Sequence, residues 1–579
     1  MPEDSLEYLR HSLAHLLAAA VMELWPDTKR TIGPAIEDGF YYDFAFTNSI
    51  SEEDLPRIEE KMRELLPTFS GFERSEMTAG EARKVFQDNK YKLELIDEFS
   101  KDGQTLTAYR SGNFVDLCRG GHADSLAHID PLSFKLTKLA GAYWRGDEKN
   151  DQLTRIYAVA FETREELEKH LVMLEEAKKR DHRKLGKELD LFVFSDLVGP
   201  GLPLWTPKGT FLREKLDEFV QELRRVRGYV RVEIPHITKK DLYEKSGHWE
   251  KFKDELFKIQ TREEHVLAMK PMNCPHHTQI FSRKSHSYRE MPQRFANTTM
   301  CYRDEQTGEL HGLSRLRSFT QDDAHVFCRE SQFTEEAFKV WDIIEAFYGA
   351  FGFLLKLRLS THDPAHMEKY LGSIERWEMS VSGLEAMLKE RGAEYVVGVG
   401  EAAFYGPKID FIAKDSIGRE WQVATIQADR NLPERFDLTC VNEAGEQERI
   451  VMIHAAIMGS IERFLSILIE HYAGALPFWL APVQIRLATV SEVFAPFAET
   501  LRAQLVEAGL RVELDVSDEK VGKKVRNAAT MKIPWTIVIG AKEVEGGDFK
   551  VNVFGQEEDL MIPAAELIAR SLSESQLPK

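Results

Sequence analysis

Cysteine is scarce in this sequence, with five residues among 579, scattered and odd in number. Such a set does not make the disulfide framework that staples small secreted domains, and its scarcity favours a reducing compartment. The five positions are Cys118, Cys274, Cys301, Cys328 and Cys440.

Long hydrophobic runs and a basic leader are lacking as well. The best apolar run near the start, residues 16–22, is interrupted by Glu23 and is far shorter than the ~20 residues that span a bilayer. The opening segment MPEDSLEYLRH is acidic where a signal peptide would be basic. We therefore expect a soluble cytoplasmic protein with no membrane segment.

Net positive charge is also missing. With 76 Lys and Arg against 95 Asp and Glu, the formal net charge is −19. A field of this sign repels phosphate and argues against non-specific coating of nucleic acid. A specific RNA held by local basic patches remains compatible with it. Residues 178–187 form one basic stretch, for which a solvated helix face is the alternative interpretation.

The chain does contain enough apolar material for several packed cores, because 43% of its residues are hydrophobic. At about 100–200 residues per domain, the length predicts roughly three to five domains. Composition and periodicity place the boundaries. We expect an α+β domain at 1–160, a connecting helix at 161–189, the largest unit at 190–477, and an α/β domain with a parallel-leaning sheet at 478–579.

Two histidines near the N-terminus, His11 and His15, are four residues apart, which places them on one face of a helix about 6 Å apart. Cys118 and His122 repeat this spacing in DLCRGGH. The set has the residue types of a closed zinc site. Two other interpretations stay open: helical histidines beside an unrelated buried cysteine, or a metal-free hydrolytic pocket whose histidines position a water and accept its proton.

The densest group of charges lies at 291–328, where two strand-like arms flank the turn TGELHGL. Guanidinium forks match phosphate oxygens bidentately, so arms that converge arginines on one place suit a nucleoside triphosphate. Phe319 is placed to stack on a base. The arginines of the arms are Arg294, Arg303, Arg315 and Arg317.

These segments resemble the signature motifs of class II aminoacyl-tRNA synthetases. The arms YRDE and HGLSRLRSFTQDDAH resemble motif 2, and GSIERF at 459–464 resembles motif 3. The helix expected at 211–227, followed by GYVRVEIPHI with Pro235, resembles motif 1 and implies a homodimer. KPMNCP, FYGPKID, HSLAH and VDLCRGGH resemble the threonyl-tRNA synthetase family, over almost the whole chain.

The resemblance implies an antiparallel class II catalytic sheet, an N-terminal editing domain and a C-terminal anticodon-binding domain. It implies one Zn²⁺ per subunit held by Cys274, His325 and His454, with open positions for the amino and hydroxyl groups of L-threonine. Valine, which lacks the hydroxyl, would be rejected by roughly 10⁴–10⁵. The implied threonine pocket is lined by Met272, Gln321, Asp323, Tyr405 and Gln427.

ATP, with Mg²⁺ on its outer phosphates, is the implied second substrate. Arg303 would bridge the threonine carboxylate and the α-phosphate, where charge develops as the adenylate forms. Arg463 is the motif 3 arginine, and His248 matches a histidine implicated in moving a proton from the terminal ribose hydroxyl of tRNA(Thr). The residues that match the family's ATP contacts are Arg303, Glu305, Arg315, Phe319, Gln422 and Arg463.

Serine keeps the hydroxyl and lacks only a methyl group, a difference that a binding pocket discriminates by only ~10–200-fold. A second site that hydrolyses seryl-tRNA(Thr) is therefore chemically required. The resemblance places it in the N-terminal domain and favours metal-free hydrolysis there. The implied pocket residues are His11, His15, Lys92, Tyr109, Asp116, Cys118 and His122.

SDEKVGKKVR in the C-terminal domain resembles the family's anticodon loop and implies contacts from Glu519, Lys520, Arg526 and Lys532. The chain departs from the family's usual pattern in starting directly in the editing domain, without a small ubiquitin-like domain. It also has unusual residues at positions near the active site and the anticodon loop, namely His276, Val423, Ala424, Asn552 and Phe554.

Two alternatives to a threonine–tRNA ligase follow from these departures. One is a synthetase paralogue that activates threonine but charges tRNA weakly. The other is an RNA-binding regulator that keeps the fold without catalysis; the simultaneous presence of Arg303, Arg463 and the three implied zinc ligands argues against it.

Overall fold

The structure is a computed structural model that describes residues 4–101 and 105–578. The chain forms two compact units, Met1–Glu175 and Glu176–Lys579. Within the described residues, no helix combines the length and the apolar composition needed to cross a bilayer.

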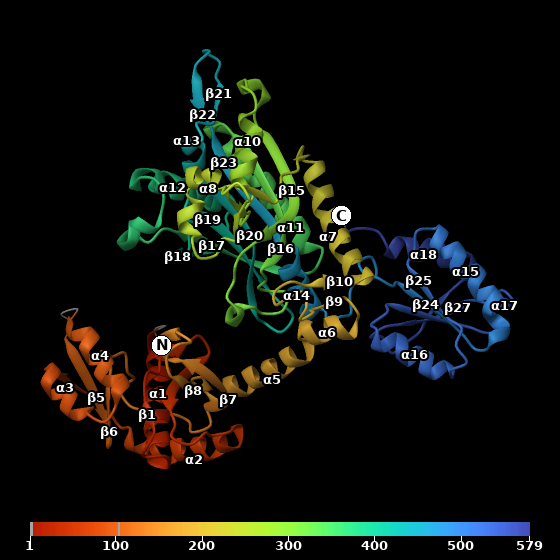
Figure 1. Cartoon of the computed structure of the whole chain (residues 1–579). Coiled ribbons are helices and arrows are strands. Elements are labelled where there is room, and N and C mark those ends of the chain that lie inside the picture. Colours follow the sequence, from red (N-terminus) through yellow and green to blue (C-terminus); the bar gives the residue numbers. More distant parts are fainter. Residues whose placement is uncertain (1–3, 102–104, 579) are drawn as a thin grey trace. The chain divides into compact units, whose positions relative to one another are not determined.

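The N-terminal unit has two separate sheets (Figure 1). Helix α1 buries leucines and alanines at helical spacing against the larger sheet, whose path is β1-β3-β8-β7 with β2 paired to β3. The smaller sheet, β4-β5-β6, packs with α3 and α4. The bounds are α1 (Asp4–Leu24), β1 (Lys29–Arg30), β2 (Ala35–Ile36), β3 (Gly39–Ala45), α2 (Leu55–Leu65), β4 (Glu73–Met77), α3 (Ala79–Val85), α4 (Lys90–Lys101), β5 (Leu106–Ser111), β6 (Phe114–Leu117), β7 (Phe134–Tyr143) and β8 (Gln152–Ala160).

The segment after this sheet is two helices, α5 (Arg164–Arg180) and α6 (His182–Glu188). Asp181 separates them because its backbone leaves the helical region, with φ −48° and ψ 118°, and its carboxylate accepts the N–H of Arg183 as an N-cap. An aspartate that caps a new helix competes with continuation of the old one. The expectation of a single helix over 161–189 is therefore wrong.

An eight-stranded sheet forms the centre of the second unit, in the order β11-β15-β16-β23-β20-β19-β17-β18. Neighbouring strands are antiparallel except at β11–β15 and β17–β18, which confirms the predicted antiparallel catalytic sheet. The bounds are β11 (Val230–Arg231), β15 (Gln293–Tyr302), β16 (Ser318–Cys328), β17 (Leu354–Thr361), β18 (Tyr395–Val399), β19 (Lys408–Lys414), β20 (Glu420–Asp429) and β23 (Val451–Ser460).

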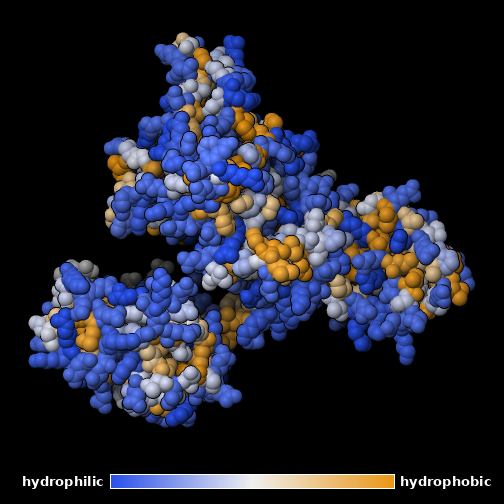
Figure 2. Space-filling model, viewed as in Figure 1, coloured by the Kyte–Doolittle hydropathy of each residue, from blue (hydrophilic) through white to orange (hydrophobic). Residues whose placement is uncertain are grey.

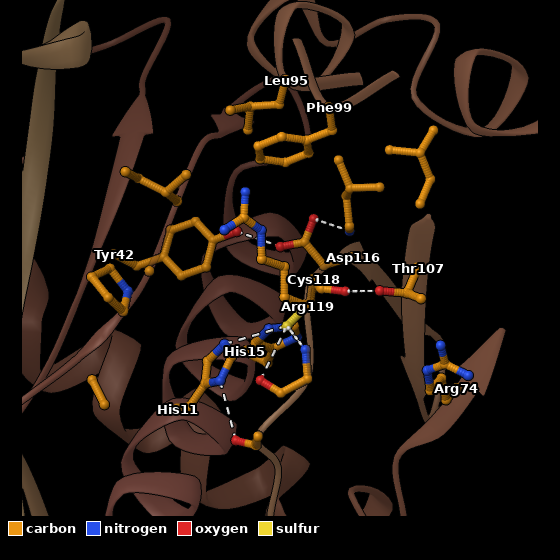
Figure 3. A pocket seen from close by; sticks show the side chains of 18 of the residues that line it. His11, His15, Tyr42, Arg74, Leu95, Phe99, Thr107, Asp116, Cys118 and Arg119 are labelled. Carbon is orange, nitrogen blue, oxygen red and sulfur yellow. Dashed lines mark hydrogen bonds between the residues drawn. The ribbon is translucent and has the colours of Figure 1, made fainter. Parts of the chain in front are cut away.

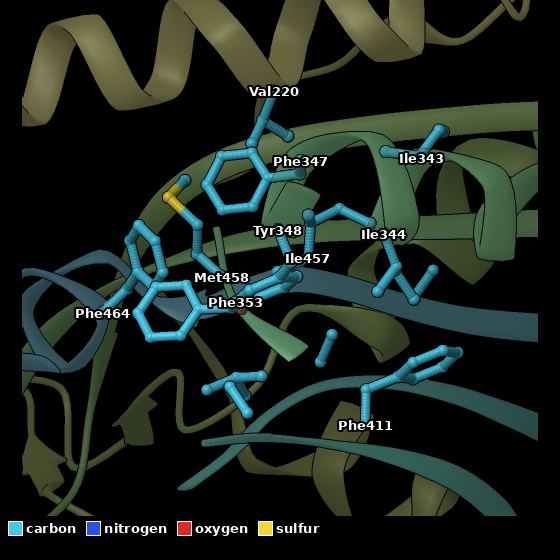
Figure 4. Close-up of a cluster of buried hydrophobic side chains, with 14 of the residues drawn as sticks. Val220, Ile343, Ile344, Phe347, Tyr348, Phe353, Phe411, Ile457, Met458 and Phe464 are labelled. Carbon is cyan, nitrogen blue, oxygen red and sulfur yellow. The ribbon is translucent and has the colours of Figure 1, made fainter. Parts of the chain in front are cut away.

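Three helices pack against this sheet: α7 (Pro207–Arg225), α11 (Phe333–Gly349) and α14 (Ile461–His471). Figure 4 shows Val220 of α7 and Phe347 of α11 close to Met458 of β23 and Phe464 of α14. The rings of Phe347 and Phe464 lie 5.1 Å apart. This apolar layer holds the helices on the strands that carry the predicted site residues.

Shorter elements complete the catalytic part and form a small sheet, β12-β14-β13, and a hairpin, β21–β22. Their bounds are β9 (Phe192–Val193), β10 (Leu204–Trp205), β12 (Ile237–Lys239), α8 (Lys240–Ser246), α9 (His248–Lys251), β13 (Lys258–Gln260), β14 (Val266–Met269), α10 (Cys274–Ser282), α12 (Ile374–Glu390), α13 (Asn431–Arg435), β21 (Thr439–Val441) and β22 (Gln447–Arg449).

The last part of the chain has its own sheet, in the order β25-β24-β26-β27-β28. Strand β24 is parallel to both of its neighbours, whereas β27 and β28 are antiparallel additions, so the predicted parallel-leaning α/β fold is confirmed. The bounds are β24 (Ile485–Thr489), α15 (Ala495–Glu507), β25 (Val512–Asp515), α16 (Val521–Thr530), β26 (Trp535–Ile539), α17 (Ala541–Val544), β27 (Phe549–Val553), β28 (Leu560–Ile562) and α18 (Leu567–Glu574).

Most of the surface in the view of Figure 2 is hydrophilic, with small hydrophobic patches. One group of exposed apolar side chains comes from the loop between β9 and β10 and its flanks, where Leu197 is fully exposed. Scattered apolar side chains are normal on a protein surface, whereas a sequence-local group of them is typical of an interface. The members are Val193, Phe194, Leu197, Val198 and Leu204.

Shortening a buried side chain of this apolar layer should lower the free energy of unfolding considerably. Phe347→Ala removes a fully buried ring, which costs about 3–5 kcal/mol, and should lower the thermal midpoint of the second unit by about 3–6 °C in calorimetry. Leu354→Ala, at a side chain that is 79% exposed, is the control and should leave the midpoint unchanged. Equal shifts for both variants would contradict this description of the core.

Candidate functional sites

Strand β16 and its register with β23 and β20 bring the predicted site residues together. Side chains alternate along a strand, so Phe319, Asp323 and His325 share one face of β16. His325 lies opposite His454 on β23, and His454 lies opposite Gln427 on β20. Directly opposed residues have Cβ atoms only about 4.5–5.5 Å apart. Three neighbouring strands therefore present one row of polar side chains.

Cys274 joins the two histidines from outside the sheet, as the first residue of α10. The possible ligand atoms of Cys274, His325 and His454 all lie within 4.8 Å of one another, and all three side chains are buried. The structure thus assembles the predicted metal-ligand set from segments 51 and 129 residues apart.

Two further side chains, from Asp429 and His277, contact the outer ring nitrogens of these histidines. His454 Nε2 donates to Asp429 Oδ2 at 2.8 Å, which leaves Nδ1 as the acceptor nitrogen. His325 Nδ1 lies 2.7 Å from Nδ1 of His277, and His325 Nε2 lies 3.1 Å from His454 Nδ1. When the proton between His325 and His277 is on His325, Nε2 of His325 and Nδ1 of His454 both carry lone pairs, and a cation between them would satisfy both.

The charges around the cluster also fit a divalent cation. Burial lowers the pKa of His325 well below its usual range, so its imidazole is neutral and able to bind a metal. Burial, with Asp323 and Asp429 nearby, raises the pKa of the Cys274 thiol well above its usual range. A positive ion at this place relieves both buried carboxylates and favours the thiolate. The donor set, two imidazoles and one thiolate, is one that zinc prefers.

The side chains predicted for the threonine pocket surround this cluster. Asn273 donates its amide to Asp323 Oδ2 at 3.0 Å, which leaves the other carboxylate oxygen open to a ligand. Tyr405 stacks on His454 with ring centroids 4.6 Å apart and donates its hydroxyl to Gln427. Met272 is partly buried against the apolar cluster that contains Cys274.

A cavity of about 700 Å³ lies on the same face of the sheet, next to Gln321. Arg303 lies between two rings, with its guanidinium carbon 5.4 Å from Phe252 and 5.3 Å from Phe319. Arg315 donates to Glu305 at 2.8 Å. The cavity is lined by every residue predicted to contact ATP, namely Arg303, Glu305, Arg315, Phe319, Gln422 and Arg463, and also by Val423 and Ala424.

The other two arginines of the arms do not reach this cavity. Arg294 forms a bidentate pair with Glu336 of α11, because nine residues of extended strand, about 30 Å, separate it from Arg303. Arg317 donates to the backbone oxygen of Glu305 at 2.9 Å and fixes the turn. The expectation that all four arginines converge on one place is therefore wrong for these two.

His248 and His276 lie deep beside the metal-ligand set. His248 Nε2 is 3.5 Å from Cys274 Sγ, and its ring is fully buried, which lowers its pKa to about 3. The predicted role of His248 in transfer to tRNA stays a prediction. His276 packs 6.1 Å from the ring of Tyr243, and neither of its ring nitrogens has a hydrogen-bond partner.

The N-terminal unit has its own cavity, of about 710 Å³, shown in Figure 3. His11 and His15 project from α1 toward Cys118. The Cys118 Sγ lies 3.4 Å from His11 Nε2 and 3.4 Å from His122 Nε2. The predicted spacing therefore does bring the four side chains together, and their possible ligand atoms lie within 4.8 Å of one another.

Asp116 is the electrostatic centre of this cavity and is fully buried. Its carboxylate pairs with Lys92 at 2.7 Å and Arg30 at 3.2 Å, and it accepts the hydroxyl of Tyr42. Burial alone would raise the pKa of Asp116, but the two cations hold that pKa well below its usual range. The cavity wall carries Arg74, Lys92 and Arg119 against Glu7 and Asp116. This excess of positive charge suits an anionic ligand rather than a metal cation.

The cluster itself is uncharged near neutral pH. Burial lowers the pKa of His122 to about 3 and raises that of the Cys118 thiol to about 11. The rings of His122 and Phe72 stack with centroids 4.4 Å apart, and Tyr109 packs on His122 at 4.7 Å. His122 and Tyr109, both predicted for this pocket, are not among the residues that line the cavity, whereas His11 and His15 line it.

The predicted anticodon residues lie before, within and just after α16. Lys520 is the N-cap residue, without a side-chain capping bond, and Glu519 accepts from Lys523 at 2.5 Å, whereas Arg526 is exposed in the middle of the helix. Lys532 follows the helix, with its Nζ 4.9 Å from the ring of Phe554. Asn552 donates to Asp559 at 3.2 Å.

Sequence reasoning missed the side chains that orient the site residues. His277, Asp429 and Asn273 hold the metal-ligand set and Asp323, and Arg30 and Tyr42 hold Asp116. Asn273, His277 and Asp429 stand within three residues of predicted site residues, and that position was the available signal; Arg30 and Tyr42 had no such signal. The partners of all these side chains are 25 to 86 residues away along the chain, which no local pattern reveals.

Comparison with known families agrees with this geometry. Residues 257–472 match the model described as "tRNA synthetase class II core domain (G, H, P, S and T)". Residues 483–574 match "Anticodon binding domain", and residues 106–157 match "Threonyl and Alanyl tRNA synthetase second additional domain". The antiparallel sheet, the arginine-lined cavity and these matches define a class II aminoacyl-tRNA synthetase.

Individual relatives narrow the class. The chain is 48% identical over 577 residues to a threonine–tRNA ligase of Gloeobacter violaceus, covering 98% of this chain and 92% of that protein. It is 46% identical over 552 residues to one of Thermotoga maritima, covering 95% and 85%. It also resembles the solved RNA binding domain of threonyl-tRNA synthetase from Cryptosporidium parvum, with 36% identity and a TM-score of 0.66 over 69% of this chain and 99% of that one. The chain belongs to the threonine–tRNA ligase family.

The raised pKa of Cys118 predicts a protonated and unreactive thiol. At pH 7 its thiolate fraction should be ~10⁻⁴, so iodoacetamide should modify it about 100-fold more slowly than a free cysteine. Peptide mass spectrometry identifies which cysteine is modified. The other four cysteines are buried, so they should react little in the folded protein. The rate should rise about tenfold per pH unit up to pH 10. A plateau near pH 8.5 would show an ordinary thiol and contradict the pKa direction.

Proposed function

We propose that this chain ligates L-threonine to tRNA(Thr). A threonine carboxylate oxygen attacks the α-phosphorus of ATP and pyrophosphate leaves. A terminal ribose hydroxyl of the tRNA then attacks the carbonyl carbon of the adenylate, loses its proton and takes the threonyl group, and AMP leaves. The observation that carries the proposal is the shared face of β16, where the arginine-lined cavity adjoins the Cys274–His325–His454 cluster. ATP and an amino acid bound there would meet.

Cys274, His325 and His454 would hold Zn²⁺, which when bound supplies a Lewis-acid centre for the amino and hydroxyl groups of threonine. Asp323 would accept a hydrogen bond from the threonine hydroxyl through the carboxylate oxygen that Asn273 does not use. Tyr405 and Gln427, joined by a hydrogen bond, would line the pocket beside the bound amino acid. A site with these polar groups leaves them unpaired when valine binds, which excludes valine strongly.

The arginines act on the phosphates. Arg303, held between Phe252 and Phe319, lines the cavity and would bridge the threonine carboxylate and the α-phosphate. Arg463, in the first turn of α14, and Arg315 would hold the remaining phosphate oxygens together with Mg²⁺. Fixed charges of this kind stabilise the transition state without reorganisation. Phe319 offers a ring for the adenine.

The N-terminal cavity would hydrolyse seryl-tRNA(Thr). Its positive wall suits the phosphates of a tRNA end, and the neutral imidazoles of His11 and His15 are able to position a water and accept its proton. The water oxygen would attack the ester carbonyl, the ribose oxygen would leave with a proton, and serine and tRNA would be released. Lys92 and Asp116 would orient the substrate rather than exchange protons with it.

The remaining assignments follow from the same family. We propose that the domains end at residues 160, 189 and 477. We also propose that the anticodon is contacted by Glu519, Lys520, Arg526 and Lys532. The exposed apolar group around Leu197 supports a homodimer. Five unpaired cysteines, all within the described residues, fit a cytoplasmic enzyme.

Amino-acid-dependent ATP–pyrophosphate exchange tests the proposed reaction. Exchange should be strong with threonine, weaker with serine and absent with valine, and it should be lost when a chelator removes zinc. His454→Ala should lose its bound zinc, as measured by metal analysis. Its threonine-dependent exchange should fall by at least 10²-fold. Cys440→Ala, at a buried cysteine outside the cluster, is the control and should keep both.

Full exchange in zinc-free enzyme would remove zinc from the mechanism. Threonine-dependent exchange without charging of tRNA(Thr) would instead identify a paralogue that activates threonine for another acceptor.

A double substitution tests the second site. His11→Ala with His15→Ala should leave threonylation unchanged and let seryl-tRNA(Thr) accumulate, because the two imidazoles that would take the proton of the attacking water are gone. Deacylation of preformed seryl-tRNA(Thr) should slow by about 10²–10⁴-fold. His128→Ala, at an exposed histidine of the same unit, is the matched control. Normal serine clearance by the double variant would place the hydrolytic site elsewhere.

A further inference from the structure

His182, the first residue of α6, is a buried histidine that the reaction described above does not use. Its Nδ1 lies 2.6 Å from Glu470 Oε1, and its backbone N–H donates to the same oxygen at 3.1 Å. Its Nε2 accepts the backbone N–H of Leu313 at 3.0 Å. Because a backbone N–H only donates, Nε2 carries the lone pair and Nδ1 carries the proton given to Glu470.

The side chains around His182 do not form a metal site, although Asp181, His182 and Glu470 lie close together. Both ring nitrogens of His182 are already used by protein partners. Asp181 caps α6 and pairs with Arg183, and Glu470 also pairs with Arg419 at 2.6 Å. The contacts of His182 therefore serve to join protein segments.

One of those segments is the turn between β15 and β16, and it forms part of the ATP cavity. Its residues His311, Leu313, Ser314 and Arg315 line the cavity. The turn lies directly on the imidazole: a Cβ built on Gly312, which has φ +50°, would come within 2.2 Å of His182 Nε2. Only glycine fits there, so the contact determines how closely the turn approaches.

The other segment is the C-terminal end of α14, which carries Glu470. The first turn of the same helix carries Arg463, which lines the same cavity as Arg315. A single imidazole thus connects the turn of one phosphate-facing arginine to the helix of the other.

We propose that His182 is a positioning residue for ATP: its Nε2 lone pair holds the 311–315 turn in the conformation that directs Arg315 at the triphosphate. The inference rests on the proposed ATP-dependent function and adds a residue to it. Without this acceptor the Leu313 N–H loses its buried partner, and the turn must move to regain one. ATP binding should weaken, whereas threonine binding, which uses side chains of β16, β20 and β23, should not change.

Three substitutions at one position separate positioning from simple packing. A glutamine amide reaches about as far as Nε2 and can accept from Leu313, whereas an asparagine amide reaches only as far as Nδ1 and can donate to Glu470. In ATP–pyrophosphate exchange by the full-length enzyme, His182→Ala and His182→Asn should raise the KM for ATP about tenfold with the KM for threonine within twofold. His182→Gln should restore the KM for ATP to within about threefold of the parent.

A matched control lies one residue beyond Glu470. His471 Nδ1 accepts the backbone N–H of Ser416 at 3.1 Å, a bond of the same kind to a turn that does not line the cavity. His471→Ala should leave the KM for ATP unchanged, even if its melting temperature falls as much as that of His182→Ala.

Two results would overturn the inference. One is an unchanged KM for ATP in both His182→Ala and His182→Asn. The other is a KM for ATP that rises equally in all three variants, together with an equal fall in their melting temperatures. Calorimetric binding of ATP alone makes the same comparison without an amino acid. Absence of threonine-dependent exchange in the parent enzyme, with ATP binding retained and weakened by His182→Ala, would reject the proposed function and keep the positioning role.

Discussion

The buried carboxylate of Asp322 is the interaction on which the catalytic part depends. It lies where the pairing of β16 with β23 shifts register, and it accepts the backbone N–H groups of Ile457 and Met458 at 3.0 and 3.1 Å. Arg224 of α7 donates to its backbone oxygen at 2.8 Å and to its carboxylate at 3.3 Å. Burial raises the pKa of Asp322 to about 6, and the arginine opposes that shift. One side chain therefore joins three segments that lie about 100 residues apart and satisfies donors that the irregular pairing would leave buried and unpaired.

The register that Asp322 holds determines which side chains face the substrates. Because successive residues of a strand alternate between faces, Asp322 points toward α7 while Asp323 and His325 point to the other side. A slip of one residue would exchange these faces and remove His325 from His454. The ATP cavity depends on the same alternation through Phe319. Activation chemistry and amino-acid selection thus share one strand, and a single error in pairing would abolish both.

The two candidate sites show that residue types alone do not decide chemistry. Both contain histidines and a cysteine with ligand atoms within 4.8 Å of one another. In the catalytic part the neighbours are the buried carboxylates Asp323 and Asp429, which favour a cation. In the N-terminal unit the buried carboxylate of Asp116 is already paired with two cations. Electrostatic surroundings, rather than the types of side chain, therefore favour a cation at one site and an anion at the other.

The sequence by itself determined the parts of this protein whose causes are local. The helical spacing of His11 and His15, the arms of the motif 2 turn and the alternation of strands and helices near the C-terminus were all predictable, because periodicity and turn residues act over a few positions. Tertiary structure alone decided which distant groups meet. Arg294 faces away from the ATP cavity because of its place along β15, and Asp429 orients His454 because β20 pairs with β23. Strand register and burial depend on the whole chain, and no local pattern encodes them.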